Sequence, residues 1–216
     1  MVDAVLFDLD GVIVDSEPVW EEVRRSYVAE HGGVWQPDTQ RRLMGMSTGE
    51  WAAYLSGELG VDRSAEQVAT EVVTEMARRY AQRVPLIDGA DAVVRRIAAR
   101  WPLGLASSSP TRLIAAALDA TGLAGAFGAT LSTEETARGK PAPDVWLAVA
   151  QRLGVDPARC VAVEDSSNGV RSAAAAGCRV VAVPHASPAR PGRRGARGRC
   201  CSRPSARSRE VVAGID

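Results

Sequence analysis

Short apolar runs alternate with helical patterns along most of this chain. The first run, Val5–Phe7, leads into Asp8-Leu9-Asp10-Gly11, which is typical of a buried strand that enters a turn. Further strands are predicted over 103–106, 160–163 and 179–183. Helical patterns cover 111–121, 143–153 and 168–176, and a glycine that suits a helix C-terminus follows each of them. Strands that alternate with helices predict a parallel α/β sheet with both faces covered.

Residues 17–83 break this rhythm, because only helices are predicted there, over 18–30, 47–59 and 64–82. The second and third helices open with capping boxes, Ser47 with Glu50 and Ser64 with Gln67. We therefore expect an α/β fold with a Rossmann-like parallel sheet core, made by residues 1–16 and 84–185, and an inserted α-helical cap domain over 17–83. The core of this cap is expected to hold Trp20, Trp51 and Tyr54.

The composition is that of an ordinary globular protein, with 46% hydrophobic and 24% charged residues. No apolar run approaches the roughly 20 residues that a membrane span needs. The acidic first ten residues lack the basic flank and cleavage site of a secretory signal. We expect a soluble, cytoplasmic protein with no membrane partner. Four cysteines without a C-x-x-C spacing and two histidines give little support to a zinc site.

The net charge of zero hides an asymmetry between the body and the tail. Residues 186–209 contain eight arginines, no acid and no Val, Ile, Leu or aromatic residue. We expect residues 186–216 to be an atypical, Arg-rich and disordered tail. The bias toward Arg, Pro, Gly, Ala and Ser favours the hypothesis of a local frame change in the gene, which resequencing would test.

The tail also raises a rival function, binding of nucleic acid or of an acidic surface. We rank nucleic acid below a small-molecule partner, because no aromatic residue in the tail is available to stack on bases.

Polar side chains gather at the predicted strand ends, the place where open parallel sheets bind ligands. Two acids at i and i+2 on an extended segment share one side and crowd their negative charge, which requires a cation. Carboxylate oxygens suit Mg²⁺, and a lysine with a hydroxyl suits a phosphoryl group. The residues concerned are Asp8, Asp10, Ser107, Glu164, Asp165 and, in the loop 139–144, Lys140.

Each of these motifs alone also has a structural interpretation. Asp-x-Asp-Gly is common in turns, Ser109-Pro110 can open a helix, and Ser166 to Asn168 can cap one. Lys140 differs, because it is the single lysine of a chain that uses arginine at every other basic position.

Taken together and in order, the motifs resemble those of the haloacid dehalogenase-like hydrolase superfamily. The resemblance is to the subgroup with a helical cap after the first motif, which includes β-phosphoglucomutases and sugar-phosphate phosphatases. It runs from about Val2 to Pro184. It rests on Asp8-Leu-Asp10-Gly-Val, Ser107 after an apolar strand, Gly-Lys140-Pro-Ala-Pro-Asp and Val-Glu164-Asp165-Ser-Ser-Asn-Gly.

The resemblance implies a nucleophile and an acid–base residue. Asp8 would form an aspartyl-phosphate, and Asp10 would protonate the leaving oxygen and then activate water. Ser107 and Lys140 would bind the transferring phosphoryl group, with Ser108 and Gly11 in the same substrate-binding set.

The resemblance also implies a site for Mg²⁺. The ion would be held by the Asp8 carboxylate, the Asp10 backbone carbonyl and Asp165. Glu164 would be a further ligand or a support to the others.

Several activities of the family fit the sequence less well. Dehalogenation works without metal, and Asp10 argues against it. Phosphonate hydrolysis uses a cap lysine, and residues 17–83 contain none. Met44 and Thr48 stand where β-phosphoglucomutases present Lys and Arg, which argues against binding of a second phosphate, so a monophosphate cleaved by water fits better.

We therefore expect a Mg²⁺-dependent phosphatase acting on a small phosphomonoester such as a sugar phosphate. A phosphosugar mutase and a phosphate-binding pseudo-enzyme remain alternatives. The particular substrate and the oligomeric state stay open.

Overall fold

The structure, a computed structural model, describes residues 1–43 and 46–183. Within these residues, five parallel strands form one sheet in the order β3-β2-β1-β4-β5. The expected α/β fold class with a parallel sheet is confirmed. The strands are β1 (Ala4–Phe7), β2 (Leu103–Ser107), β3 (Ala129–Ser132), β4 (Cys160–Glu164) and β5 (Arg179–Ala182).

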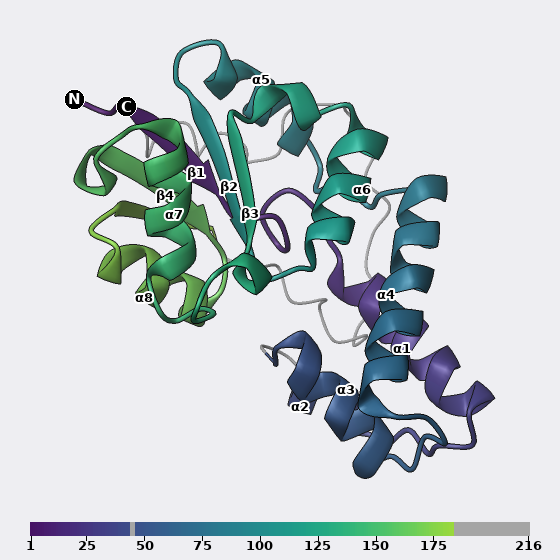
Figure 1. Ribbon diagram of the computed structural model, residues 1–216. Coiled ribbons are helices and arrows are strands. Elements are labelled where there is room, and N and C mark those ends of the chain that lie inside the picture. Colours follow the sequence, from purple (N-terminus) through teal and green to yellow (C-terminus); the bar gives the residue numbers. More distant parts are fainter. Residues whose placement is uncertain (44–45, 184–216) are drawn as a thin grey trace, which may run out of the picture.

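Helices cover both faces of the sheet (Figure 1). Helices α5 (Ala90–Ala98) and α6 (Thr111–Thr121) pack on one face, and α7 (Asp144–Leu153) and α8 (Ser167–Ala175) on the other. Because strand side chains alternate, Val5 and Phe7 join the core under α5 and α6, whereas Leu6 joins the core under α7. The central strand β1 is therefore buried on both faces, as its uninterrupted apolar run predicts.

Four further helices lie between β1 and β2 along the chain and stand apart from the sheet in Figure 1. We call α1–α4 the helical part. Both predicted capping boxes form, at Ser47 and Ser64. The division into core and cap domains stays a prediction. The helices are α1 (Glu17–Glu30), α2 (Thr39–Leu43), α3 (Thr48–Gly57) and α4 (Ala65–Gln82).

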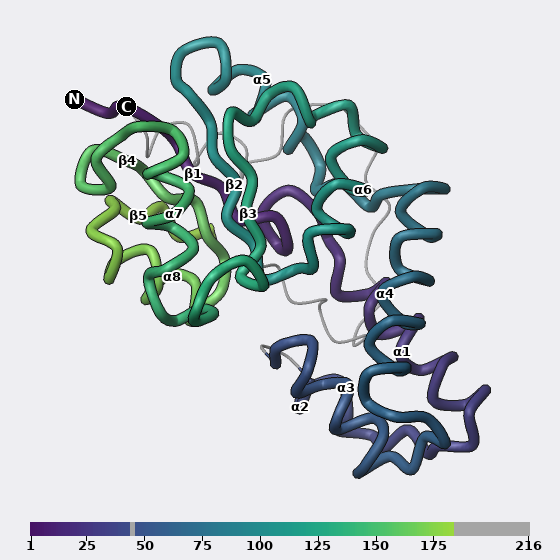
Figure 2. The backbone as a smooth tube through the Cα atoms, viewed as in Figure 1, coloured from purple at the N-terminus to yellow at the C-terminus, as the bar shows by residue number. Residues whose placement is uncertain are grey.

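Two chain segments connect the sheet with the helical part, one after β1 and one after α4 (Figure 2). They run antiparallel and are hydrogen-bonded to each other through an isolated bridge between Val14 and Leu86. The Asp15 amide donates to the Pro85 carbonyl at 2.8 Å, and the Ile87 amide donates to the Ile13 carbonyl at 2.9 Å. The two segments therefore leave the sheet as a pair.

Some predictions cannot be compared with the structure. The tail prediction for 186–216 lies outside the described residues, as does Met44 of the loop that differs from mutases. Among the helices of residues 1–43 and 46–183, none has the length and apolar character needed to cross a membrane.

Candidate active site

Three strand ends meet at one edge of the sheet. Asp8 follows β1 directly, Ser107 ends β2 and Glu164 ends β4. Since β1 lies between β2 and β4, these three side chains become neighbours. Asp8 is only 5% exposed, and its amide donates to the Val163 carbonyl at 3.0 Å, which fixes the backbone where β1 ends.

Lys140 comes from the loop before α7 and reaches into this edge. Its Nζ donates to Asp8 Oδ1 at 2.7 Å, to Glu164 Oε2 at 2.7 Å and to the Ala106 carbonyl at 3.0 Å. It also lies 4.6 Å from the ring centre of Trp146. All three ammonium hydrogens therefore have acceptors, a pattern that the planar fork of an arginine would not reproduce.

The charges of this cluster depend on one another. Burial acts to lower the pKa of Lys140, but the carboxylates of Asp8 and Glu164 outweigh it and hold that pKa above its ordinary value. Burial raises the pKa of Asp8 well above its usual range, and Lys140 only partly opposes this. Burial and the neighbouring Glu164 charge raise the pKa of Asp165 to about 7. One lysine does not balance the acids, so the site favours a further cation.

Glu164 is held by the start of α8. Burial acts to raise its pKa, but Lys140 and the hydrogen bonds at the helix start outweigh it and lower the pKa. Its Oε1 accepts from the amides of Asp165 and Ser166, each at 2.9 Å, and from the Ser166 hydroxyl at 3.0 Å. A Cβ at Gly169 would lie 1.7 Å from Glu164 Oε2, so only glycine leaves room for this carboxylate.

Within the described residues, Asp8, Glu164 and Asp165 form a group that could hold a metal ion. Each offers a carboxylate oxygen, and these atoms lie within 4.8 Å of one another. An all-oxygen donor set fits Mg²⁺. Glu164 already accepts four hydrogen bonds, so fewer of its lone pairs remain for an ion.

Asp10, the fourth residue predicted for the metal, turns its carboxylate toward β2. Its Oδ2 accepts from the hydroxyls of Ser107 at 3.2 Å and Ser109 at 2.7 Å. Its Oδ1 is buried without a hydrogen-bond partner among the described residues. The role predicted for its backbone carbonyl stays a prediction.

The residues predicted to bind substrate occupy different environments. Ser107 is fully buried, and its hydroxyl joins Asp10 to the Ser109 amide. Ser108 is exposed. Gly11 has a φ of +76°, and a Cβ there would lie 2.0 Å from Asp165 Oδ2. Gly11 therefore lets the β1 turn approach Asp165 closely, and the binding roles of these residues stay predictions.

Two contributors were not found from the sequence. Ser109 holds Asp10, and Trp146 lies beside Lys140. The spacing of Ser107 and Ser109 at i and i+2 could have indicated a shared partner. The hydrophobic pattern of the sequence places Trp146 in the core under α7, and it gives no indication of a contact with Lys140.

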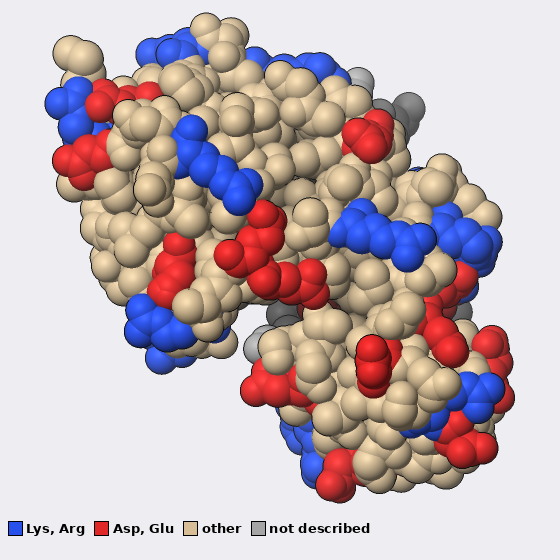
Figure 3. Space-filling view, viewed as in Figure 1, with Lys and Arg blue, Asp and Glu red and all other residues tan. Residues whose placement is uncertain are grey.

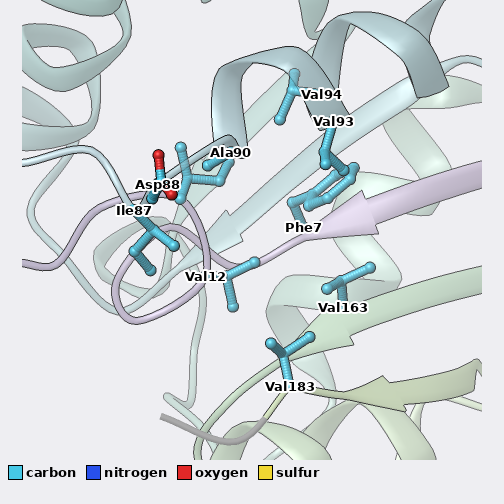
Figure 4. A pocket seen from close by; sticks show the side chains of 10 residues that line it. Phe7, Val12, Ile87, Asp88, Ala90, Val93, Val94, Val163 and Val183 are labelled. Carbon is cyan, nitrogen blue, oxygen red and sulfur yellow. The ribbon is translucent and has the colours of Figure 1, made fainter. Parts of the chain in front are cut away.

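Apart from this cluster of side chains, a pocket lies on the α5 face of the sheet (Figure 4). Phe7 of β1, Val163 of β4 and Val93 and Val94 of α5 point into it. Asp88 is its one charged lining residue in the described part of the chain. Its lining suits apolar groups, so it is not the place for a phosphoryl group.

Several known proteins resemble this chain. Residues 2–177 match the family described as haloacid dehalogenase-like hydrolase. The chain is 32% identical over 186 residues to a phosphorylated carbohydrates phosphatase of Thermotoga maritima, covering 85% of this chain and 86% of that protein. It is 33% identical over 187 residues to hexitol phosphatase B of Escherichia coli K12, covering 84% and 83%.

Solved structures show the same arrangement of elements. CbbY from Rhodobacter sphaeroides in complex with phosphate has a TM-score of 0.74 at 25% identity, covering 85% of this chain and 87% of that one. A β-phosphoglucomutase from Clostridium difficile has a TM-score of 0.69 at 22% identity, covering 84% of each chain, and shows the fold alone.

Proposed function

Because the chain belongs to the haloacid dehalogenase-like hydrolase family, we propose that it is a Mg²⁺-dependent phosphatase that forms an aspartyl-phosphate on Asp8. The substrate is a small phosphomonoester, and a sugar phosphate fits best. The names of the two phosphatases that are 32% and 33% identical to the chain support this substrate class.

The observation that carries the proposal is the position of Lys140 between Asp8 and Glu164, at 2.7 Å from each. A buried lysine that pairs with the carboxylate at the end of β1 holds that carboxylate in one orientation. It also places a positive charge where an anionic phosphoryl group must approach.

The first chemical step belongs to Asp8. A carboxylate oxygen attacks phosphorus, the bond between phosphorus and the ester oxygen breaks, and Asp10 gives its proton to the leaving oxygen. The Ser107 and Ser109 hydroxyls hold one oxygen of Asp10 and leave Oδ1 for this exchange.

In the second step, water attacks the phosphorus of the aspartyl-phosphate. Asp10 takes a proton from the water, the bond between Asp8 and phosphorus breaks, and inorganic phosphate leaves. Asp8 returns to its carboxylate and Asp10 to its acid, so the cycle closes with one water consumed.

Asp8 and Asp165 would hold the metal ion together with the backbone carbonyl of Asp10, and Glu164 would keep Lys140 and the start of α8 in place. When bound, Mg²⁺ supplies positive charge that favours ionised Asp8 and Asp165 and offsets the charge of the phosphoryl oxygens.

The helical part would act as a cap over the site. In Figure 1 the strands of the sheet point toward the side of the molecule on which α1–α4 lie. A cap that excludes water and selects the organic part of the substrate suits this placement. The cytoplasmic location expected from the sequence is part of the same proposal.

Release of inorganic phosphate tests the proposal. We expect the purified chain to hydrolyse members of a panel of sugar phosphates, phosphoglycolate and nucleotides with Mg²⁺, and to stop when a chelator is added. Asp8→Asn should lower the rate by at least about 10³-fold. Asp119→Asn, the same change at an exposed position of α6, should keep the rate.

Other outcomes point elsewhere. Conversion of a sugar phosphate into an isomer without release of phosphate would favour the mutase alternative. A folded chain that binds phosphate but turns over nothing would favour a pseudo-enzyme. Hydrolysis that survives Asp8→Asn would contradict the proposed nucleophile.

A further inference from the structure

Arg24 is a buried cation in the helical part. It lies in the middle of α1 and is only 6% exposed. Burial lowers its pKa to about 10, and the negative charges of Glu17 and Asp10 oppose this lowering. Arg24 is therefore charged at neutral pH. It also lies within range of the negative charge of Asp10, which is one of the candidate active-site residues.

Two tryptophans cover one side of the guanidinium. Its central carbon lies 4.4 Å from the ring centre of Trp20 and 4.9 Å from that of Trp51. The two ring centres are 5.9 Å apart, so the rings form a corner rather than two opposite walls. Indole rings attract a cation but accept no strong hydrogen bond, so the rings hold Arg24 without satisfying its N–H groups.

The Arg24 Nε is buried and has no hydrogen-bond partner among the described residues. A charged donor left in this state costs free energy, and a ligand that accepts a hydrogen bond from it would recover that cost. A second buried group without a partner belongs to Gln40 of α2, which contacts α1: its Nε2 donates to Glu17 Oε2 at 2.7 Å, while its own Oε1 has no partner in the described part of the chain.

Three of these residues share one side of α1. Glu17, Trp20 and Arg24 recur at i, i+3 and i+7, which places them on a single helix face. That face begins directly after the connection from β1, which carries Asp8 and Asp10. Figure 3 shows the surface hollowed between the region of α2 and α3 and the region of α7 and α8.

We propose that Arg24 binds a second anionic group, on the part of the substrate that is not transferred. The inference rests on the proposed phosphatase function and narrows its substrates to phosphomonoesters that also carry a carboxylate or a second phosphate. A guanidinium fork matches both groups through paired hydrogen bonds. Arg24 would do this from α1, whereas the loop with Met44 and Thr48 offers no cation.

The test compares pairs of substrates that differ by one anion. The carboxylate pair is 2-phosphoglycolate and 2-hydroxyethyl phosphate, and the phosphate pair is glucose 1,6-bisphosphate and glucose 1-phosphate. We expect the wild type to favour the anionic member of at least one pair by roughly 10- to 100-fold in kcat/KM, chiefly through KM. The pair that shows the preference identifies the anion.

Variants of Arg24 test whether this residue causes the preference for the anionic substrate. Arg24→Gln should bring the ratio of kcat/KM within the preferred pair close to one, and Arg24→Lys should keep part of it. Arg25→Gln removes the same charge from an exposed position on the same helix and should keep the full ratio. Equal loss on both members of each pair, or no preference in the wild type, would overturn the proposal.

A binding measurement separates the two proposals. The Asp8→Asn protein, titrated calorimetrically with both members of each pair, reports affinity without turnover. If the wild type hydrolyses no compound, the proposed function fails. The subsite would still be supported if the anionic member binds more tightly than its partner and if Arg24→Lys weakens this binding. Equal affinities within both pairs would refute it. This readout also serves if Arg24→Gln does not fold.

Discussion

Two glycines shape this site through the side chains they lack. Gly11 admits Asp165 to the turn after β1, and Gly169 admits Glu164 to the first turn of α8. Gly11 also needs its positive φ, whereas Gly169 has ordinary helical geometry. A substitution at Gly169 therefore tests the steric effect without backbone strain.

We expect Gly169→Ala to lower kcat/KM by roughly 100-fold, because the new methyl group displaces Glu164 and with it Lys140. Gly49→Ala is the matched control, since a Cβ at this exposed helical position meets nothing within 4 Å. The control should keep full activity and gain about 0.5–1 kcal/mol of stability from helix propensity. Phosphate release and urea unfolding measure both effects, and an active Gly169→Ala would show that the Glu164 position does not matter.

At this scale the sequence predicts residue types better than their partners. Lys140 was identified because it is a lone lysine, and the structure gives it three acceptors. The link between Ser109 and Asp10 could not be predicted, because it depends on how the turn after β1 sits against the end of β2.

Among the elements, α4 is tied to α1 by an ion-pair network. Arg79 contacts Glu75 on its own helix and Glu22 on α1, each at 2.7 Å, and Arg78 contacts Glu75 at 2.6 Å. Hydrogen bonds from Arg78 and then Arg79 lower the pKa of Glu75 to about 2, against the effect of burial.

This network predicts how stability changes with pH. A carboxyl group with a lowered folded-state pKa stabilises the protein above its unfolded pKa of about 4.3 and loses that contribution as pH falls toward 2. We expect Glu75→Gln to cost about 1 kcal/mol at pH 6, a small value because the side chain is 33% exposed. The difference from wild type should shrink between pH 4.5 and 2.

Denaturant unfolding at several pH values measures this change. The control is Glu30→Gln, which makes the same charge change at the exposed end of α1 and outside the ion-pair network. A difference between Glu75→Gln and wild type that stayed constant down to pH 2 would count against an electrostatic origin.

The elements differ in how well the sequence predicts them. Long amphipathic helices with capping boxes, such as α3 and α4, were expected and are present. Helix α2 and strand β3 were not among the expected elements, because five and four residues carry too little periodicity. Helix α5 was also not named, although Val93, Val94 and Ile97 mark its buried face.

For the whole molecule, the three carboxylates that could hold a metal ion come from the ends of β1 and β4, which are distant in sequence. An ion that binds only the folded chain stabilises it, by about 2.7 kcal/mol at 100 times its dissociation constant. We expect Mg²⁺ to raise the melting temperature of the wild type and to leave that of Asp165→Asn unchanged. Without Mg²⁺, Asp165→Asn should be at least as stable as wild type, because burial and the Glu164 charge disfavour the ionised carboxylate.

Thermal unfolding with and without Mg²⁺ checks both parts. Asp119→Asn makes the same charge change at an exposed position of α6, and this variant should keep the full response to the ion. An equal Mg²⁺ response in Asp165→Asn would place the metal elsewhere.

The strand order has a consequence for how the chain folds. β1 precedes both of its neighbours along the chain, and Val5 pairs in register with Leu103 on one side and with Val161 on the other. Closing loops of this length costs more entropy than forming local helices, so α1–α4 can gain structure well before the sheet closes. The strand that leads into Asp8 is thus made before both of its neighbours and receives the second only after β4 has been made. Until then the Val5-Leu6-Phe7 run stays available to chaperones and to other unfinished chains.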